Sequence, residues 1–142
     1  MSELKIGVVG AAGRMGATLV RMVHETQGCR VAGGIERPGS PAVGKDLGDI
    51  AGIGRLDLEI GDNALELFVG LDAVLDFTMP DATVEFAAIA AQARIVHVIG
   101  TTGFTDAHEE KIHAAARHAR IIKSGNMSIG VNLLAALVKQ VA

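Results

Sequence analysis

Short apolar runs alternate along this chain with longer segments in which apolar residues recur at helical spacing. The apolar runs predict buried strands over residues 4–9, 31–35, 71–77, 95–99 and 120–123. The intervening segments predict helices over residues 14–26, 80–93 and 105–118. Strands that alternate with helices predict an α/β fold of the Rossmann type. Such a fold is doubly wound, with a mostly parallel sheet and helices on both faces.

Local signals support the three helices. Met15 and Leu19 fall on one face of the first helix, at a spacing of four residues. Pro80 suits the first turn of the second helix, where the missing N–H would have no partner in any case. Thr105 can cap the third helix, and the acidic residues that follow suit the positive end of its dipole.

Two segments depart from this alternation. Residues 37–60 contain two prolines and five glycines, which predicts a long loop with at most a short strand over residues 56–60. The C-terminal segment, residues 129–142, has an apolar helical pattern that ends without a cap, a glycine or a proline. This pattern predicts either a helix packed on the sheet or a chain that is part of a longer protein.

Composition is typical of a soluble globular protein with one domain. The chain has 142 residues, of which 49% are hydrophobic and 20% are charged. The net charge of −3 and the lack of a basic run argue against a nucleic-acid partner. No apolar stretch is long enough to span a membrane, and we see no signal peptide. Cys29 is the only cysteine, so we expect no internal disulfide and a cytoplasmic protein.

The first motif is GAAGRMG, over residues 10–16, which follows a predicted strand and opens a predicted helix. Gly10 allows a tight turn, Gly13 lets the backbone approach a pyrophosphate, and Gly16 lets helix and strand pack closely. Free N–H groups at the helix start favour an anion. The spacing is one residue longer than the common GxGxxG pattern, so glycines that merely make a turn are the alternative.

The second motif is Glu36-Arg37, 20 residues after Gly16 and at the end of the second predicted strand. An acidic residue at this point accepts hydrogen bonds from the ribose hydroxyls of adenosine, and alone it would select NAD. The guanidinium of Arg37 can hold a 2′-phosphate. Together the two side chains predict tolerance of both NADH and NADPH, unless Arg37 is only a solvated loop charge.

Further polar segments follow the later strands, and the carboxyl ends of strands are where open α/β sheets bind ligands. Phe77 and Thr78 would lie beside the cofactor, although a strand end with a helix cap is the alternative. Two hydroxyls between glycines would lie near the nicotinamide, in a segment that contains Gly100, Thr101 and Thr102. The last polar segment would lie on the same rim and contains Ser124, Gly125, Asn126 and Met127.

No constellation of catalytic or metal-ligating residues accompanies these motifs. His108, His113 and His118 are spaced by five residues, so each step rotates by ~140° around a helix and they share no face. We expect surface histidines there, and His24 and His97 stand alone in the sequence. Cys29 precedes an apolar strand and suits packing better than nucleophilic chemistry. Hydride transfer needs few protein groups, because the cofactor carries the chemistry.

Taken together, the segments GAAGRMG, ERPGS, DFTMPDAT, VIGTTGF and SGNMSIGVN resemble the dihydrodipicolinate reductase family of lysine and diaminopimelate biosynthesis. The resemblance covers nearly the whole chain in the same order. It implies that Glu36 and Arg37 read the adenosine ribose and any 2′-phosphate. It also implies that Gly100, Thr101 and Thr102 line the nicotinamide side, and that residues 124–127 close the pocket. By the same resemblance, the pyrophosphate is wrapped by Gly10, Ala11, Ala12, Gly13, Arg14 and Met15.

The resemblance also implies what this chain lacks. Family members often carry an aromatic residue where Met127 stands here. The family's catalytic and substrate segments lie in a second domain, which also forms the homotetramer. We therefore expect a dinucleotide-binding domain over residues 1–128 and the start of an interdomain helix over residues 129–142. The chain should bind NADH or NADPH but should not reduce the cyclic dicarboxylate substrate by itself.

Two other functions are compatible with parts of the pattern. A stand-alone nucleotide-binding or redox-sensing module would also lack catalytic residues, although no DNA-binding or partner domain is evident. Another two-domain dehydrogenase, of the homoserine or aspartate type, would share the glycine motif. The pairing of GTTGF with NMSIGVN argues against that third interpretation.

Overall fold

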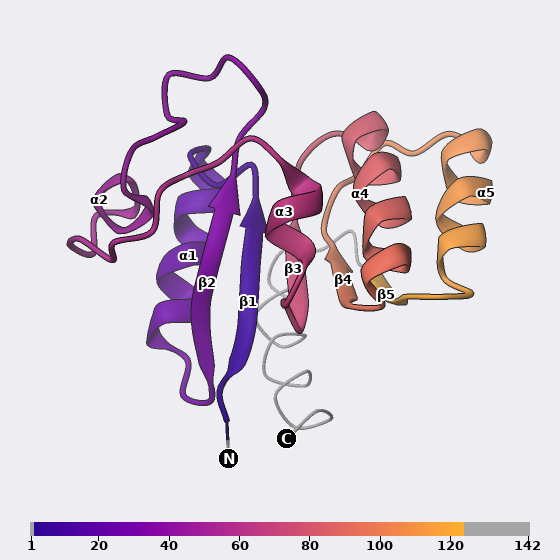
Figure 1. Ribbon diagram of the computed structural model, residues 1–142. Coiled ribbons are helices and arrows are strands. Elements are labelled where there is room, and N and C mark those ends of the chain that lie inside the picture. Colours follow the sequence, from indigo (N-terminus) through magenta and orange to yellow (C-terminus); the bar gives the residue numbers. More distant parts are fainter. Residues whose placement is uncertain (1, 124–142) are drawn as a thin grey trace.

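The computed structural model describes residues 2–123 and contains a five-stranded parallel sheet. The spatial order of the strands is β2-β1-β3-β4-β5, so the chain reverses its direction of winding between β1 and β3. This arrangement confirms the predicted Rossmann-type fold (Figure 1). The strands are β1 (Leu4–Val9), β2 (Cys29–Ile35), β3 (Ala73–Asp76), β4 (Val96–Ile99) and β5 (Arg120–Lys123).

Five helices connect the strands within this part of the chain. They are α1 (Arg14–Glu25), α2 (Leu47–Ala51), α3 (Ala64–Phe68), α4 (Pro80–Ala93) and α5 (Asp106–Ala115). In Figure 1, α1 lies behind the sheet, whereas α3, α4 and α5 lie in front of it. The hydrophobic core accordingly has two layers, one on each face of the sheet. Neighbouring residues of β1 face opposite sides, so Val8 belongs to one layer and Val9 to the other.

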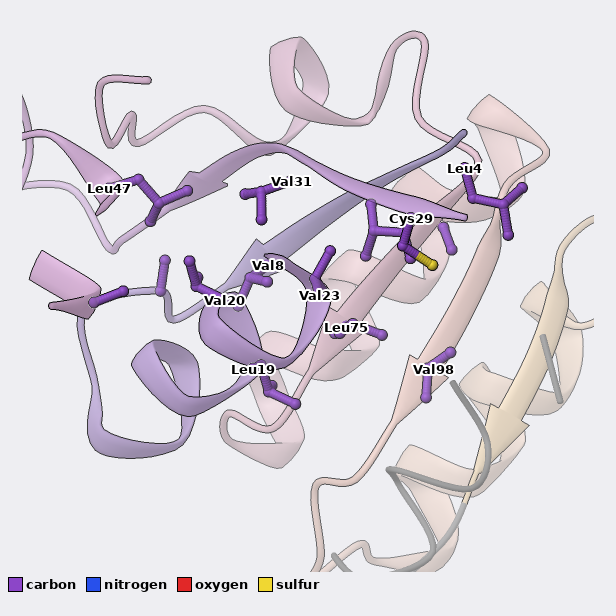
Figure 2. Packing of buried hydrophobic residues seen from close by; sticks show 14 of the residues in the cluster. Leu4, Val8, Leu19, Val20, Val23, Cys29, Val31, Leu47, Leu75 and Val98 are labelled. Atoms are coloured by element: carbon purple, nitrogen blue, oxygen red, sulfur yellow. The ribbon is translucent and has the colours of Figure 1, made fainter. Parts of the chain in front are cut away.

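One layer packs α1 against the sheet. Figure 2 shows Val20 and Val23 of α1 beside Val8 of β1, and Leu19 belongs to the same cluster. Leu75 of β3 is in register with Val8 and lies on the same face of the sheet. The other layer packs α3 and α4 against the opposite face and contains Val9, Val74, Phe68 and Ala90. Aliphatic side chains fill most of both layers, as the low aromatic content predicts.

Several element boundaries differ from the predictions. Three elements, β1, α4 and β5, match to the residue, but β2 begins at Cys29, and α5 ends at Ala115. The strand prediction began too late because an exposed arginine at position 30 interrupts the apolar run. Cys29 itself is buried within β2, which confirms a packing role. Burial raises the pKa of its thiol, and the nearby Glu3 carboxylate raises it further.

The predicted long loop over residues 37–60 is wrong in one respect, because it contains α2. This helix has only five residues, too few for a hydrophobic period to be visible in the sequence. It forms because Asp46 caps its start and Gly52 ends it in the left-handed conformation, with φ of 77°. The predicted short strand over residues 56–60 is reduced to single bridges at Glu59 and Gly61.

Two predictions concern residues outside the described range. These are the polar segment Ser124, Gly125, Asn126 and Met127, and the helical pattern over residues 129–142. Within residues 2–123, no helix is long and apolar enough to cross a membrane.

Candidate functional site

The carboxyl ends of the strands meet along one edge of the sheet. The register places Ile35, Val9, Asp76 and Ile99 side by side on neighbouring strands. The residues that follow each of them therefore share one rim, and they include Glu36, Gly10, Phe77 and Gly100. The structure thus brings together the motifs that the sequence analysis placed at strand ends.

The glycine turn, residues 10–16, is fixed by close backbone packing. Gly10 has a φ of +64°, a conformation that favours glycine. A Cβ atom at Gly16 would lie 2.0 Å from the carbonyl oxygen of Gly10, so only glycine fits there. The N–H of Ala11 donates to the carbonyl of Ile35 at 3.0 Å, which ties the turn to β2. These contacts confirm the predicted tight turn and close packing.

Gly13 has a different role, because the protein itself does not require a glycine there. A Cβ atom at Gly13 would lie 3.4 Å from its nearest neighbour, the carbonyl oxygen of Gly10. Gly13 is the N-cap of α1, and no side chain caps this helix start in the described structure. The absent side chain therefore leaves the positive end of α1 open to an anion from solvent.

Glu36 lies directly beside this turn. Its Oε1 accepts a hydrogen bond from the N–H of Ala12 at 2.9 Å. Its own N–H donates to the carbonyl of Gly61 at 2.9 Å, which fixes the backbone beyond β2. The bond to Ala12 holds the carboxylate at the edge of the glycine turn. Its other oxygen has no protein donor among the described contacts and can accept bonds from a ligand.

A cleft of about 1040 Å³, the glycine-turn cleft, opens between this turn, the loop after β2 and the start of α4. Its size suits a large part of a dinucleotide. The predicted site residues that line it are Gly10, Ala12, Gly13, Glu36, Arg37 and Thr78. Others that line it were not predicted, including Ser40, Lys45, Asn63, Leu65, Met79 and Phe86.

The unpredicted lining residues add chemistry to the cleft. Lys45 adds a second cation to the lining that contains Arg37, and Asp62 and Glu85 add two carboxylates. Met79 and Leu65 are 69% and 55% exposed, which is unusual for large apolar side chains, and both border the cleft. We call Leu65 and Met79 the apolar wall of the cleft. The sequence does not reveal this wall, because Leu65 belongs to a short helix and Met79 precedes α4. Only the fold brings them opposite the loop after β2.

Asp46 holds the loop that carries Lys45. Its Oδ1 accepts from the N–H groups of Gly48 and Leu56, both at 2.9 Å, and from that of Asp49 at 3.1 Å. Its Oδ2 accepts from the N–H of Leu58 at 3.1 Å. The bond from Leu56, with those from the other three amides, holds the pKa of Asp46 below its ordinary value. The Asp46 carboxylate thus ties the start of α2 to the segment of residues 56–58.

The rim beyond β3 and β4 is more closely packed than expected. The ring of Phe77 lies over Gly100, where a Cβ atom would approach ring carbon Cε2 to 2.0 Å. Thr101 is 5% exposed, and its hydroxyl is hydrogen-bonded inside the protein. The hydroxyl of Thr101 is therefore engaged within the protein, and the place of this residue near the nicotinamide stays a prediction. Thr102 is exposed and keeps that possibility.

The remaining predicted contacts lie around the glycine-turn cleft rather than in it. Ala11 is fully buried, and Met15 packs against the core. Arg14 is exposed at the start of α1. Phe77, Gly100, Thr101 and Thr102 are on the rim but do not line the cleft.

The histidines differ in their surroundings. His108 completes the cap of α5 with Thr105 and lies 2.7 Å from Asp81 of α4, so it is structural. His113 and His118 are exposed, as predicted. The interpretation of His97 as isolated is wrong, because its ring is buried against Asp76. Among residues 2–123, no group of three or more His, Cys, Asp or Glu side chains could hold a metal ion.

A comparison with protein families identifies a match that covers most of the chain. The family described as the N-terminus of dihydrodipicolinate reductase matches residues 4–127. The chain is 61% identical over 142 residues to the 4-hydroxy-tetrahydrodipicolinate reductase of Chelativorans sp. (strain BNC1), covering all of this chain and 51% of that protein. It is 59% identical to the enzyme of the same name from Sinorhizobium medicae, covering 99% of this chain and 52% of that one. The chain thus spans about half the length of the curated relatives it matches.

Solved structures show the same fold. A dipicolinate-bound dihydrodipicolinate reductase from Paenisporosarcina sp. TG-14 matches with a TM-score of 0.65 and 22% identity, over 90% of this chain and 49% of that one. An NAD-binding protein from Listeria innocua matches with a TM-score of 0.62 and 21% identity, over 89% of this chain and 36% of that one. At these identities the likeness concerns the fold alone.

Proposed function

The chain belongs to the dihydrodipicolinate reductase family, in which it matches the N-terminal part, and we propose that it binds NADH or NADPH for that reductase. The observation that carries this proposal is the open helix start at Gly13, with the carboxylate of Glu36 fixed beside it. A group that brings both a pyrophosphate and a ribose diol fits these two features. The residues present therefore fit a nicotinamide dinucleotide.

Each part of the cofactor has a matching part of the glycine-turn cleft. The N–H groups at the start of α1 suit the pyrophosphate, and the second oxygen of Glu36 suits the ribose hydroxyls. The exposed side chains of Met79 and Leu65 suit the flat faces of adenine. Phe77, Gly100 and Thr102 lie on the rim beyond the cleft. We propose that these residues, together with residues 124–127, line the nicotinamide side.

The loop after β2 supports relaxed selectivity between the two cofactors. Glu36 opposes a 2′-phosphate by charge, whereas Arg37 and Lys45 attract it. The lining also contains Asp62 and Glu85, so the cleft carries two cationic and three acidic side chains. We therefore propose that it accepts both cofactors.

The bound cofactor supplies the hydride for the reduction of the cyclic dicarboxylate. This chain's part is to hold the dinucleotide and to keep its adenosine end out of water. We propose that substrate binding, proton transfer and homotetramer formation belong to further residues of the intact cytoplasmic enzyme. The 142-residue chain should thus bind cofactor without turnover, and measurable reduction of the dicarboxylate by the purified chain would contradict this division.

The replacement of Glu36 by alanine tests the proposed binding mode. It removes the ribose acceptor and the bond to Ala12, so NADH affinity should fall about tenfold or more, as expected for a lost charge-assisted hydrogen bond. NADH fluorescence titration measures this change. Glu59→Ala is the matched control, because this exposed carboxylate lies on the adjacent segment outside the cleft lining. Equal binding by the two variants, or no binding by the unaltered chain, would refute the proposal.

A further inference from the structure

A buried acid and histidine form a pair beneath the rim. Asp76 ends β3, His97 lies within β4, and the side chains of both are fully buried. Nε2 of His97 lies 2.8 Å from Oδ2 of Asp76. Because His97 is in register with Val74, its side chain is on the same sheet face as that of Asp76, two residues farther along β3.

The other oxygen of the Asp76 carboxylate organises the segment after β3. Oδ1 accepts from the hydroxyl of Thr78 at 2.6 Å and from its N–H at 3.2 Å. The hydroxyl of Thr101 lies 3.4 Å from the same oxygen. A buried carboxylate is costly unless donors surround it, so the contacts at Oδ1 and the contact of His97 at Oδ2 together fix its orientation.

Thr101 extends the network to a second strand end and to α4. Its hydroxyl oxygen accepts from the N–H of Thr78 at 3.0 Å and from the hydroxyl of Thr83 at 2.8 Å. Thr83 is fully buried in α4. We call this set of five residues the threonine clamp: Asp76, Thr78, Thr83, His97 and Thr101.

The clamp reaches the glycine-turn cleft through Thr78. This residue lines the cleft, and its Cγ2 lies 2.9 Å from where a Cβ atom at Gly10 would be. Thr78 therefore packs against the glycine turn and forms the part of the cleft lining next to it. A displacement of Thr78 would change the shape of the cleft beside the turn.

We propose that His97 is a positioning residue for dinucleotide binding, because it orients the Asp76 carboxylate that holds Thr78 and Thr101 at the rim. This inference rests on the proposed function. Because a carboxylate oxygen can only accept, we assign the proton to Nε2 of His97, and without this donor Oδ2 has no other among residues 2–123. The carboxylate then turns to find another partner, and Thr78 moves with it.

A purely space-filling role explains the histidine less well. Nδ1 of His97 is buried and has no hydrogen-bond partner among the described residues, which is a cost that an aliphatic side chain would avoid. The contribution that distinguishes histidine from an aliphatic residue here is the contact of its Nε2 with Asp76. Glutamine carries an amide N–H at a similar reach, whereas leucine fills similar space without a donor.

The test compares NADH affinity in His97→Leu, His97→Gln and Val98→Ala. Val98 is on the opposite face of β4 and 2% exposed, so its truncation lowers stability without touching the clamp. We expect His97→Leu to lose about tenfold or more in affinity, and the other two variants to stay within about threefold of the unaltered chain. Each titration is made below the melting temperature, with folding checked by circular dichroism.

Three results would overturn the inference: unchanged affinity in His97→Leu, no rescue by glutamine, or an equal loss in Val98→Ala. If His97→Leu does not fold, Thr83→Val tests the clamp from α4, since it removes only the hydroxyl that bonds Thr101. It should lose affinity while remaining folded, and normal affinity would overturn the inference. Failure of the unaltered chain to bind NADH would refute the proposed function itself.

Discussion

Replacing Gly13 with alanine should separate ligand binding from folding. A Cβ atom there would lie 3.4 Å from the carbonyl oxygen of Gly10, which is ordinary contact and the nearest approach to any described residue beyond its two chain neighbours. Alanine is a poorer N-cap than glycine but also reduces the freedom of the unfolded chain, and these effects oppose each other. The free energy of unfolding should therefore change by less than about 1 kcal/mol.

Ligand affinity should change far more. The new methyl group occupies the open space in front of the first turn of α1, where the pyrophosphate would approach the backbone. Loss of close contact with the N–H groups there should cost ~1.4–2.8 kcal/mol, or about tenfold to a hundredfold in Kd. Valine at the same position is larger and should abolish measurable binding.

The assay combines thermal melting with NADH titration, and two glycines serve as controls. Gly16→Ala brings a Cβ atom within 2.0 Å of the carbonyl oxygen of Gly10, so overpacking of about 3 kcal/mol should lower Tm by roughly 10 °C. Gly61→Ala has room, with its nearest contact at 3.8 Å, and lies outside the cleft lining, so both readouts should stay unchanged. Normal NADH binding by Gly13→Val would refute the assignment of the turn.

Three further outcomes follow from the site and its surroundings. Arg37→Ala and Lys45→Ala should each weaken NADPH several-fold more than NADH in calorimetry, and equal losses would argue against a phosphate site. The pKa of Asp46 is lowered, so its contribution to stability is present above the ordinary value of 3.8 and is lost as pH falls through the folded value. Asp46→Asn should make the melting temperature fall less steeply as the pH is lowered. The same dependence of melting temperature on pH as in the unaltered chain would contradict this prediction. The raised pKa of buried Cys29 predicts slow reaction with a thiol reagent at pH near 8 that speeds up in denaturant, and fast reaction in the folded chain would contradict it.

The hydrophobic pattern was sufficient to predict the sheet and its three long helices. Buried parallel strands read as apolar runs, and the glycine turn carries its own signature in the sequence. The rule that ligands bind at the carboxyl ends of parallel strands places Glu36, Thr78 and Gly100 on one rim. The short helices α2 and α3 were not predicted, because five residues are too few for a helical hydrophobic period to be visible. Asp46 and Gly52, the caps of α2, are residue types that favour helix ends.

Contacts between distant segments were the least predictable part of the site. The apolar wall of the cleft comes from Leu65 and Met79, which only the fold brings opposite the loop after β2. His97 gave no signal, because its partner Asp76 is 21 residues away and lies beside it only through the β3–β4 register. The sequence likewise did not indicate that the hydroxyl of Thr101 turns inward to that pair.

Calorimetric titration of the purified 142-residue chain with NADH and with NADPH tests the central claim most directly. One site per chain is expected for each cofactor, and the two cofactors should compete for it. Heat signals indistinguishable from dilution for both cofactors, from a chain whose circular dichroism shows it folded, would contradict the account.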